Sequence, residues 1–411
     1  MPFLSGKRAF LELLKQEGIE LIFGNPGTTE LPLMDALARE KQLRYILGLQ
    51  EAAVMAMADG YAQASGKLCA VSVHVAPGLG NAMGMLYNAR EAGAPIIVTA
   101  GQHPQNFSFS EPLLWADLPE IARPFVKWSA EVRRLEDLPV AIHRAATTAL
   151  APPTGPVFLS LPGDVLTSEA DIELGAPSRV APHVRGDRDA IAAAAELCAA
   201  AERPLIFAGD AVAQSDALAE MTAFAELLGA PVYAEVVPSR ASFPSTHPLF
   251  HGAMTRLQKA MREILARHDL VISVGADLFT LSLPSKVDAL PDNIAIVHID
   301  TDPWELGKNY PARAAILGDP KATLPDLTAE LASRMTGKAR ERAQQRRQTI
   351  EREIREERAA LHTSARAVAD RDPIEAFALV QALGEALPPD AVVIDETISS
   401  GRGMRVFLRS D

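Results

Sequence analysis

Short apolar runs alternate with longer amphipathic or Ala-rich stretches along the first part of the chain. The apolar runs lie at residues 20–24, 44–49, 68–75, 95–101 and 156–162. Each has the length of one buried strand, and the stretches between them have the spacing of helices. This alternation predicts a mainly parallel sheet with helices on both faces.

A polar, Pro-containing stretch at residues 175–190 interrupts the pattern, and a second α/β series follows it. Its expected strands lie at residues 204–210, 231–236, 270–277, 294–300 and 314–319. Because the interruption separates the two series, we predict a second, separate open sheet.

The charged stretch at residues 336–371 interleaves Glu and Arg, which predicts a solvated linker helix rather than a basic nucleic-acid arm. Residues 372–411 then read as a helix, a Pro-Pro-Asp turn and a strand at 391–395. Such a short segment cannot bury a core alone, so it either docks on the other domains or opens a further domain. The predicted fold class is α/β, with two open, mainly parallel sheets and the start of a third α/β domain.

The composition of the chain argues against several classes of protein. The 411-residue chain is 48% hydrophobic and carries a formal net charge of −12, which argues against nucleic-acid and anionic-membrane partners. Its two cysteines, Cys69 and Cys198, are too few for a disulfide framework. Neither a signal peptide nor an apolar run of spanning length is visible, so we expect a cytoplasmic protein.

Two turns follow predicted strands of the first sheet. In "FGNPGTTELPL", Asn25-Pro26-Gly27 has turn chemistry, and Thr28 and Thr29 are predicted to cap the next helix. Open α/β sheets bind ligands at the carboxyl ends of their strands, where this turn is predicted to lie. A plain strand-to-helix turn without a ligand would have the same sequence pattern.

The second turn, "HVAPGLGNAMG", places His74 at a strand end. There the histidine is either a core residue or a proton-transfer group. The glycine spacing does not match a dinucleotide fingerprint. The second series has Gly-Asp and Gly-Ala at two strand ends, in "FAGDAVA" and "VGADLF". Neither completes a nucleotide-binding fingerprint, so a nucleotide site in the second sheet is weakly supported. Glu51 heads an apolar helix, where an acid is also common for the helix dipole alone.

Several motifs in order resemble the thiamine-diphosphate-dependent decarboxylases, the benzoylformate decarboxylases in particular. They are "FGNPGTTELPL", "YILGLQEAAVMAMADGYAQASGK", "HVAPGLGNAMG", "APIIVTAGQ" and "RPFVKWSAEV". The resemblance implies a pyrimidine-binding domain at residues 1–175 and a middle domain at 186–335. The charged linker at 336–371 would then lead to an incomplete diphosphate-binding domain at 372–411.

The resemblance implies that Glu51 is catalytic and hydrogen-bonds N1′ of the cofactor's aminopyrimidine. A poorly solvated carboxyl group can share a proton with that nitrogen, which favours the imino form that deprotonates the thiazolium. Asn25, Pro26, Gly27 and Glu51 would bind thiamine diphosphate, and Ser399 matches a diphosphate contact. The expected ligands of Mg²⁺ would lie beyond residue 411, so the chain itself supplies no metal ligand.

His74 falls on the family's active-site histidine and would move protons on the substrate. Thr28 stands where benzoylformate decarboxylase has a substrate-binding serine. Leu113 and Leu114 match an apolar wall of the substrate pocket, which destabilises a carboxylate relative to the charge-dispersed transition state.

Two departures qualify the resemblance. Ser282 replaces a second active-site histidine, which puts benzoylformate as the substrate in doubt. Acetolactate synthases, the neighbouring family, lack a histidine before their Pro-Gly turn, so "HVAPG" argues against them.

The implied function is non-oxidative decarboxylation of a 2-oxo acid, with or without carboligase activity. The implied assembly is a homodimer or homotetramer with its active site between subunits, and the chain alone would be inactive or nearly so. The alternatives are an acetolactate-synthase-like carboligase, a non-catalytic nucleotide-binding or regulatory relative and, less favoured, a nicotinamide-dependent oxidoreductase.

Overall fold

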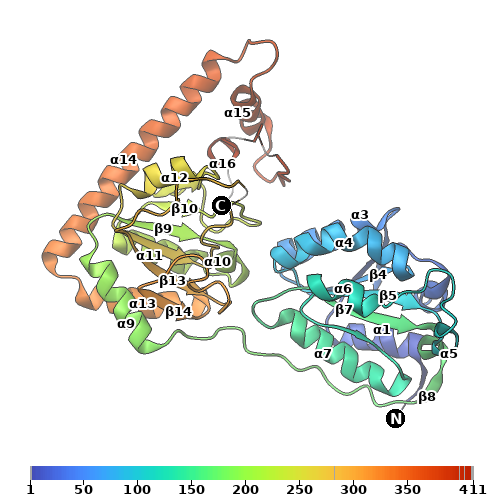
Figure 1. The fold of residues 1–411 in the computed structure, drawn as a ribbon. Helices are drawn as coiled ribbons and strands as arrows, with labels where there is room; N and C mark the ends of the chain where they lie inside the picture. The colour runs from blue at the N-terminus through green and yellow to red at the C-terminus, as the bar shows by residue number, and fades with distance from the viewer. Residues whose placement is uncertain (1, 282, 398, 402, 409–411) are drawn as a thin grey trace. The chain divides into compact units, whose positions relative to one another are not determined.

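The computed structural model describes residues 2–281, 283–397, 399–401 and 403–408. Contacts divide the chain into two compact units, Met1–Pro182 (unit 1) and His183–Asp411 (unit 2) (Figure 1). Each unit contains a six-stranded sheet in which all neighbouring strands are parallel. The predicted fold class is therefore confirmed.

The sheet of unit 1 has the strand order β3-β2-β4-β5-β7-β6. Its strands are β2 (Leu21–Gly24), β3 (Arg44–Leu47), β4 (Cys69–Val73), β5 (Ile96–Gln102), β6 (Ser129–Glu131) and β7 (Val157–Pro162). The five predicted strands form as β2, β3, β4, β5 and β7, with ends that differ by no more than two residues from the predicted ones. The sequence did not predict β6, because this three-residue edge strand carries no apolar run. A separate antiparallel pair joins β1 (Phe3–Ser5) to β8 (Glu169–Asp171).

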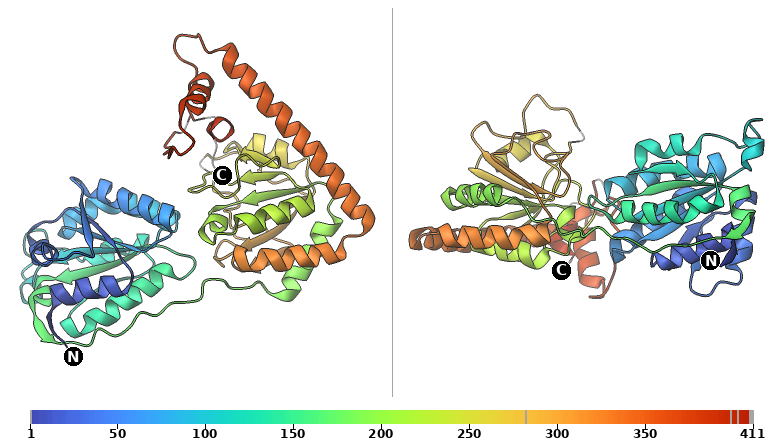
Figure 2. Two further views of the ribbon diagram at one scale, coloured as in Figure 1. Left: turned by 180° about the vertical axis from the view of Figure 1, so that it is seen from behind. Right: turned by 90° about the horizontal axis from the view of Figure 1, so that it is seen from below.

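Alternate residues of the central strands enter two different cores of unit 1. Ala70 and Ile97 pack toward α1 (Gly6–Gln16) and α7 (Leu138–Leu150). Val71 and Val98 pack toward α3 (Glu51–Ser65), α4 (Val75–Glu91) and α6 (Leu118–Ala122). The helices therefore cover both faces of the sheet (Figures 1 and 2), and apolar residues on both faces explain the unbroken apolar runs.

Short helices connect these elements. They are η1 (Thr28–Glu30), α2 (Leu31–Leu37), α5 (Gln105–Ser108), η2 (Arg123–Phe125), η3 (Leu135–Asp137) and α8 (Gly163–Thr167).

The sheet of unit 2 has the order β11-β10-β9-β12-β13-β14. Its strands are β9 (Pro204–Ala208), β10 (Val232–Ala234), β11 (Phe250–Ala253), β12 (Leu270–Val274), β13 (Ala295–Asp300) and β14 (Ala314–Leu317). One face packs against α9 (Arg188–Ala200), α11 (Leu218–Leu228) and α13 (Pro320–Arg334), and the other against α12 (Gln258–Leu265). The short α10 (Asp210–Gln214) follows β9, and β11 was not predicted.

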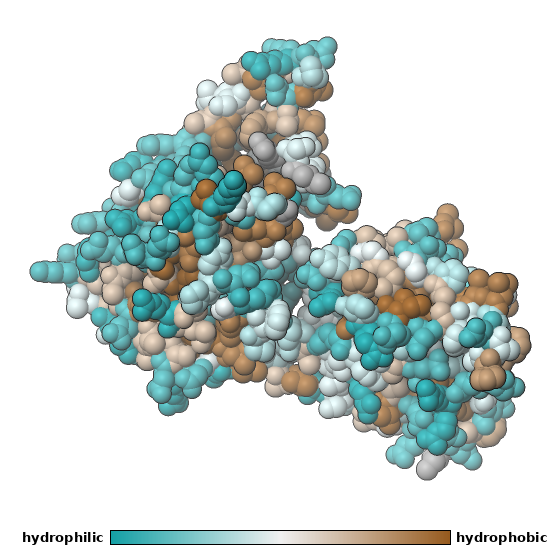
Figure 3. Space-filling model, viewed as in Figure 1, coloured by the Kyte–Doolittle hydropathy of each residue, from teal (hydrophilic) through white to brown (hydrophobic). Residues whose placement is uncertain are grey.

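The predicted linker helix forms as α14 (Gly337–Ala367), but it is not fully solvated. Ala339 and Ala343 belong to the main core of unit 2, and Ile354 is also buried. Figure 2 shows α14 running along unit 2, and its outer side is hydrophilic in Figure 3. The high charge of α14 therefore reflects one exposed face of a packed helix.

The predicted strand at residues 391–395 is wrong. Two short helices, α15 (Ala376–Ala386) and α16 (Met404–Phe407), form in the final segment, but residues 391–397 have no regular structure. Val392 and Ile394 are 90% and 91% exposed. A strand requires a neighbouring strand to pair its backbone groups, and none of the three described sheets includes this segment. Among the described residues, no helix is long and apolar enough to cross a membrane.

Candidate active site

The candidate site lies at the carboxyl edge of the unit 1 sheet. Because β2, β4 and β5 are parallel neighbours, the residues that follow them meet at one edge. Asn25 follows β2 and His74 follows β4, while Glu51 begins α3 after β3. The structure therefore brings together residues that are up to about 50 positions apart in the sequence.

Glu51 is held by two amide side chains. Its Oε1 accepts a hydrogen bond from Asn25 Nδ2 at 3.0 Å, and its Oε2 accepts one from Asn81 Nδ2 at 2.9 Å. The residue is only 7% exposed, although it carries a carboxyl group. Gln50 caps the same helix through bonds from the Ala52 and Ala53 amides, so the capping role does not need Glu51.

His74 forms a second cluster with Glu30. The Nδ1 atom of His74 lies 2.8 Å from Glu30 Oε2 and 3.1 Å from Thr29 Oγ1. Glu30 is 1% exposed and also accepts bonds from the Gly27 and Gly101 amides and from the Thr29 hydroxyl. This one carboxyl group therefore connects the ends of three strands.

Glycine is required where the two turns meet. A Cβ atom built on Gly27 would lie 2.3 Å from the ring of His74, and one on Gly101 would lie 2.2 Å from Glu30 Oε1. Both distances are far below van der Waals contact. The absence of a side chain at these positions allows the backbone to pack directly against the histidine and the carboxyl group.

Tyr45 lies beside this cluster. Burial, and next the negative charge of Glu30, raise the pKa of its hydroxyl above the ordinary tyrosine value. Within the part of the chain that the structure describes, its buried hydroxyl has no hydrogen-bond partner. Tyr45 is therefore neutral at physiological pH, and its hydroxyl is a buried polar group beside Glu30.

Sequence models of one enzyme family match both units. Residues 4–110 match the model described as "Thiamine pyrophosphate enzyme, N-terminal TPP binding domain", and residues 191–327 match "Thiamine pyrophosphate enzyme, central domain". Together these ranges cover more than half of the chain. The chain belongs to the thiamine pyrophosphate enzyme family. The motif-based resemblance is thereby confirmed.

Individual relatives give the same family. The chain is 34% identical to benzoylformate decarboxylase of Pseudomonas aeruginosa over 79% of its length, and 31% identical to acetolactate synthase of Mycobacterium bovis over 80%. It spans only 61% and 53% of those two proteins. A solved structure, the thiamine diphosphate-dependent 4-hydroxybenzoylformate decarboxylase of Rhodococcus jostii RHA1, has a TM-score of 0.82 at 28% identity. That alignment covers 99% of this chain and 73% of the other.

The predicted substrate-binding residues of this thiamine pyrophosphate enzyme lie at the surface of unit 1. Thr28 is exposed, and Leu113 and Leu114 are 83% and 39% exposed in the loop after β5. This loop is tied to the end of β5, because His103 Nε2 bonds the carbonyl oxygen of Leu113 and Gln102 Nε2 bonds that of Ala116. Leu47, Leu49, Phe107 and Phe109 are also exposed large apolar residues of unit 1.

The other predicted residues divide between the two units. Pro26 lies in the β2 turn between Asn25 and Gly27, whereas Ser399 is exposed in unit 2. Ser282 lies outside the described residues. Among the described residues, no group of three or more His, Cys, Asp or Glu side chains could hold a metal ion.

The donor set of unit 1 fits one end of thiamine diphosphate. Glu51 is a buried hydrogen-bonding group beside the Asn25-Pro26-Gly27 turn and would hold the aminopyrimidine. A diphosphate instead requires backbone donors and a cation, which this cluster of carboxyl groups does not offer. The fit is therefore to the pyrimidine end of the cofactor.

Sequence reasoning missed Glu30 and Asn81. Glu30 stands three residues after Gly27, a spacing typical of a carboxylate that bonds back to the start of a helix. That signal could have been found. Asn81 had no comparable signal, because it lies within α4 and pairs with a residue 30 positions away.

The predicted capping by Thr28 and Thr29 is wrong. Both residues form the 3₁₀ turn η1, and neither side chain bonds the start of α2. The Thr29 hydroxyl donates to Glu30 instead, at 2.7 Å. A hydrogen bond from the Thr29 hydroxyl to a carboxylate is stronger than a bond from a backbone amide of α2 to the hydroxyl oxygen.

The carboxyl edge of the unit 2 sheet is acidic. Burial raises the pKa of Glu235 well above its ordinary value, and next the charges of Asp210 and Asp277 raise it further. Burial also raises the pKa of Asp300, at the end of β13, to about 7. Clustered acids disfavour a nucleotide diphosphate at this edge.

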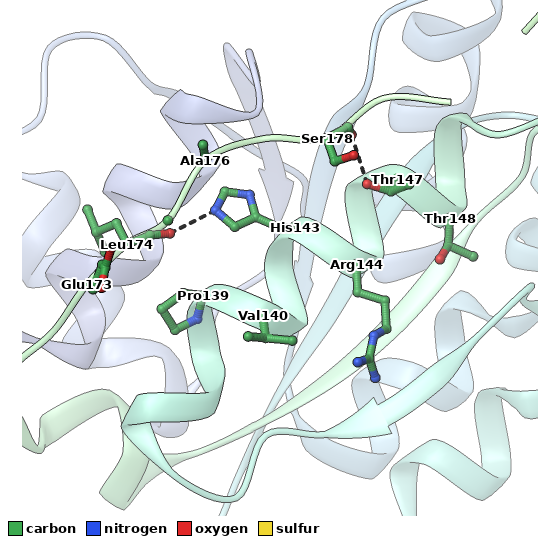
Figure 4. A pocket seen from close by; sticks show the side chains of 11 residues that line it. Pro139, Val140, His143, Arg144, Thr147, Thr148, Glu173, Leu174, Ala176 and Ser178 are labelled. Atoms are coloured by element: carbon green, nitrogen blue, oxygen red, sulfur yellow. Dashed lines mark hydrogen bonds between the residues drawn. The ribbon is translucent and has the colours of Figure 1, made fainter. Parts of the chain in front are cut away.

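A separate pocket of unit 1 lies between α7 and residues 173–178 (Figure 4). His143 Nε2 bonds the Leu174 carbonyl at 2.8 Å, and Thr147 Oγ1 donates to the Ser178 carbonyl at 2.9 Å. The other ring nitrogen of His143 contacts buried Glu17, which also pairs with Arg179. None of the predicted site residues lines this pocket, and its contacts fasten the segment after β8 to α7.

Proposed function

We propose that this chain is the cofactor-activating part of a thiamine-diphosphate-dependent enzyme that decarboxylates a 2-oxo acid. The observation that carries the proposal is the placement of Glu51. It is a buried carboxyl group at the head of α3, with both oxygens bonded by asparagines, at the sheet edge that also carries His74. Its position at the ligand-binding edge of the sheet, together with its burial, supports a functional role.

Each residue of the site has a distinct role in this proposal. Glu51 would hold the aminopyrimidine and share a proton with its N1′ atom, while Asn25 and Asn81 orient the carboxyl group. His74 would exchange a proton with the substrate through its Nε2 atom. Thiamine diphosphate, when bound, would accept the electron pair that remains on the substrate when CO₂ leaves. Mg²⁺ would accompany its diphosphate.

Decarboxylation is favoured over carboligation by two observations. His74 would provide a proton-transfer group at the strand end. Leu113 and Leu114, exposed apolar residues of the loop after β5, would contribute an apolar wall for the substrate carboxylate. Carboligation as in acetolactate synthase is the second candidate, supported by the 31% identity to that enzyme. The acidic edge of unit 2 weighs against a nucleotide-binding regulatory protein.

The test is CO₂ release from a panel of 2-oxo acids, with thiamine diphosphate and Mg²⁺. The chain is assayed alone and together with a polypeptide that carries a relative's diphosphate-binding domain. Glu51→Gln keeps the size of the side chain but cannot share the proton, so its rate should fall by about 10²- to 10⁴-fold. The product mixture, analysed for C–C-ligated 2-hydroxy ketones, separates decarboxylase from carboligase.

Glu17→Gln is the matched control, because Glu17 is an equally buried glutamate of unit 1 whose side chain contacts His143 instead. It should leave the rate of CO₂ release unchanged. Equal rates for the wild type and Glu51→Gln would overturn the assignment of Glu51.

A further inference from the structure

We propose that Glu30 is a positioning residue that fixes the tautomer and orientation of His74. The inference deepens the proposed function, on which its catalytic consequence rests. The tautomer itself follows from hydrogen bonds within unit 1 and can be measured without cofactor or substrate.

Three hydrogen-bond donors surround the carboxyl group of Glu30. Oε1 accepts the Gly101 amide at 2.9 Å and the Thr29 hydroxyl at 2.7 Å, and Oε2 accepts the Gly27 amide at 2.8 Å. Backbone amides can only donate. Glu30 is only 1% exposed, and these three donors make it a hydrogen-bond acceptor toward its neighbours.

This acceptor decides which nitrogen of His74 carries the proton. Nδ1 lies 2.8 Å from Glu30 Oε2, so it must donate. It also lies 3.1 Å from Thr29 Oγ1, whose own proton points to Glu30 Oε1 and whose lone pairs are therefore available. Two oxygen acceptors around Nδ1 require the Nδ1–H tautomer of the neutral ring. Nε2 is then the nitrogen that takes up a proton.

The backbone restrains the same ring. Gly27 packs against the ring so closely that a Cβ there would lie 2.3 Å away. The next residue, Val75, is fully buried and has a φ of +38°, which is an unfavourable conformation for a β-branched side chain. Strain of this kind persists only where the surroundings impose it, and here it fixes the exit of the chain from His74.

Loss of Glu30 should therefore change how His74 works rather than whether the substrate binds. Without the acceptor, the neutral ring can adopt the Nε2–H form, which cannot accept a proton at Nε2. We expect kcat to fall by about 100-fold in Glu30→Ala, within the range of a general acid–base contribution, with little change in KM.

The decisive measurement is the tautomer of His74, read from the ¹⁵N chemical shifts of histidine-labelled protein without cofactor. His74→Asn assigns the resonances. In the wild type, Nδ1 should have the shift of a protonated nitrogen and Nε2 that of an unprotonated one. In Glu30→Ala the populations should move toward the Nε2–H form, with Glu30→Gln as the second, size-conserving variant.

Glu17→Gln again serves as the control, because it neutralises another buried glutamate bonded to a histidine in the same unit. His74 should keep its wild-type shifts in that variant. The inference fails if His74 of the wild type is the Nε2–H tautomer. This outcome is read from the wild type alone, so a variant that does not fold cannot affect it. The inference also fails if a folded Glu30→Ala leaves the tautomer unchanged, or if Glu17→Gln shifts it as much. An inactive wild type with the expected tautomer would count against the proposed function alone.

Discussion

Buried carboxyl groups of this chain differ in the donors around them. Glu30 has three donors besides the ring of His74, and Glu51 has two asparagine amides. In unit 2, the carboxyl group of Asp300 accepts a bond from the Asp302 amide, and burial raises its pKa to about 7. Burial with few donors therefore stabilises the neutral form of Asp300.

Asp300 predicts a pH dependence of stability. Its folded-state pKa of about 7 lies above the ordinary 3.8, so between these values the folded state binds a proton that the unfolded state has lost. Its contribution is complete below pH 4 and is lost as the pH rises through 7, by at most about 4 kcal/mol. Asp300→Asn should therefore flatten the fall in stability between pH 5 and 8.

Urea denaturation followed by circular dichroism at both pH values measures this effect. Asp292→Asn is the control, because its side chain is 92% exposed. The slope should be reduced rather than abolished, since burial also raises the pKa of Glu235 and Asp210. An identical pH dependence for the wild type and Asp300→Asn would contradict the prediction.

At the scale of elements, α14 shows how a highly charged helix is fastened to a domain. Arg346 donates to the Leu228 carbonyl, at the end of α11, and Arg358 donates to the carbonyls of Ser245 and Phe250. Burial lowers the pKa of both guanidinium groups. The apolar stems of arginine can cover the surface of the domain while their charged heads donate to backbone oxygens.

Arg358→Met should loosen α14 locally. The substitution keeps an apolar stem but removes bonds to two carbonyls, at a cost of about 1.5–3 kcal/mol. We expect faster hydrogen exchange in the second half of α14, measured by mass spectrometry of peptides from that helix. Arg352→Met, at an exposed position of the same helix, should leave exchange unchanged. Equal exchange in the two variants would show that Arg358 does not fasten the helix.

At the scale of the whole molecule, the chain contains two units with their own cores. Unit 1 has two large hydrophobic clusters, one on each face of its sheet, and unit 2 has another two. The segment that follows β8 is held on unit 1 by Glu17, His143 and Thr147. Each unit therefore has the size and the buried surface of an independently folding domain.

The fragment 1–182 should fold on its own. We expect a single cooperative thermal transition and a dispersed amide spectrum, because its sheet is covered on both faces by its own helices. Ile97→Ala, at a fully buried position near the start of β5, should lower the stability of this fragment by about 2–5 kcal/mol. A fragment without a cooperative transition would contradict the division at residue 182.

The sequence by itself determined the central strands, the helices between them and the turn at Asn25-Pro26-Gly27. Strands buried on both faces must be apolar throughout, and turn residues have local conformational preferences, so both signals are contained in neighbouring positions. The family, the placement of His74 at a strand end and that of Glu51 at the head of a helix were predictable for the same reason.

Only the tertiary structure decided which side chains face each other. Glu30 and His74 are 44 positions apart, and Glu51 and Asn81 are 30 apart, so no local pattern announces either pair. The short strands β6 and β11 and the unpaired segment 391–395 depend in the same way on whether a neighbouring strand is present. Hydrogen-bond partners across a sheet are set by strand order, which is a property of the folded chain.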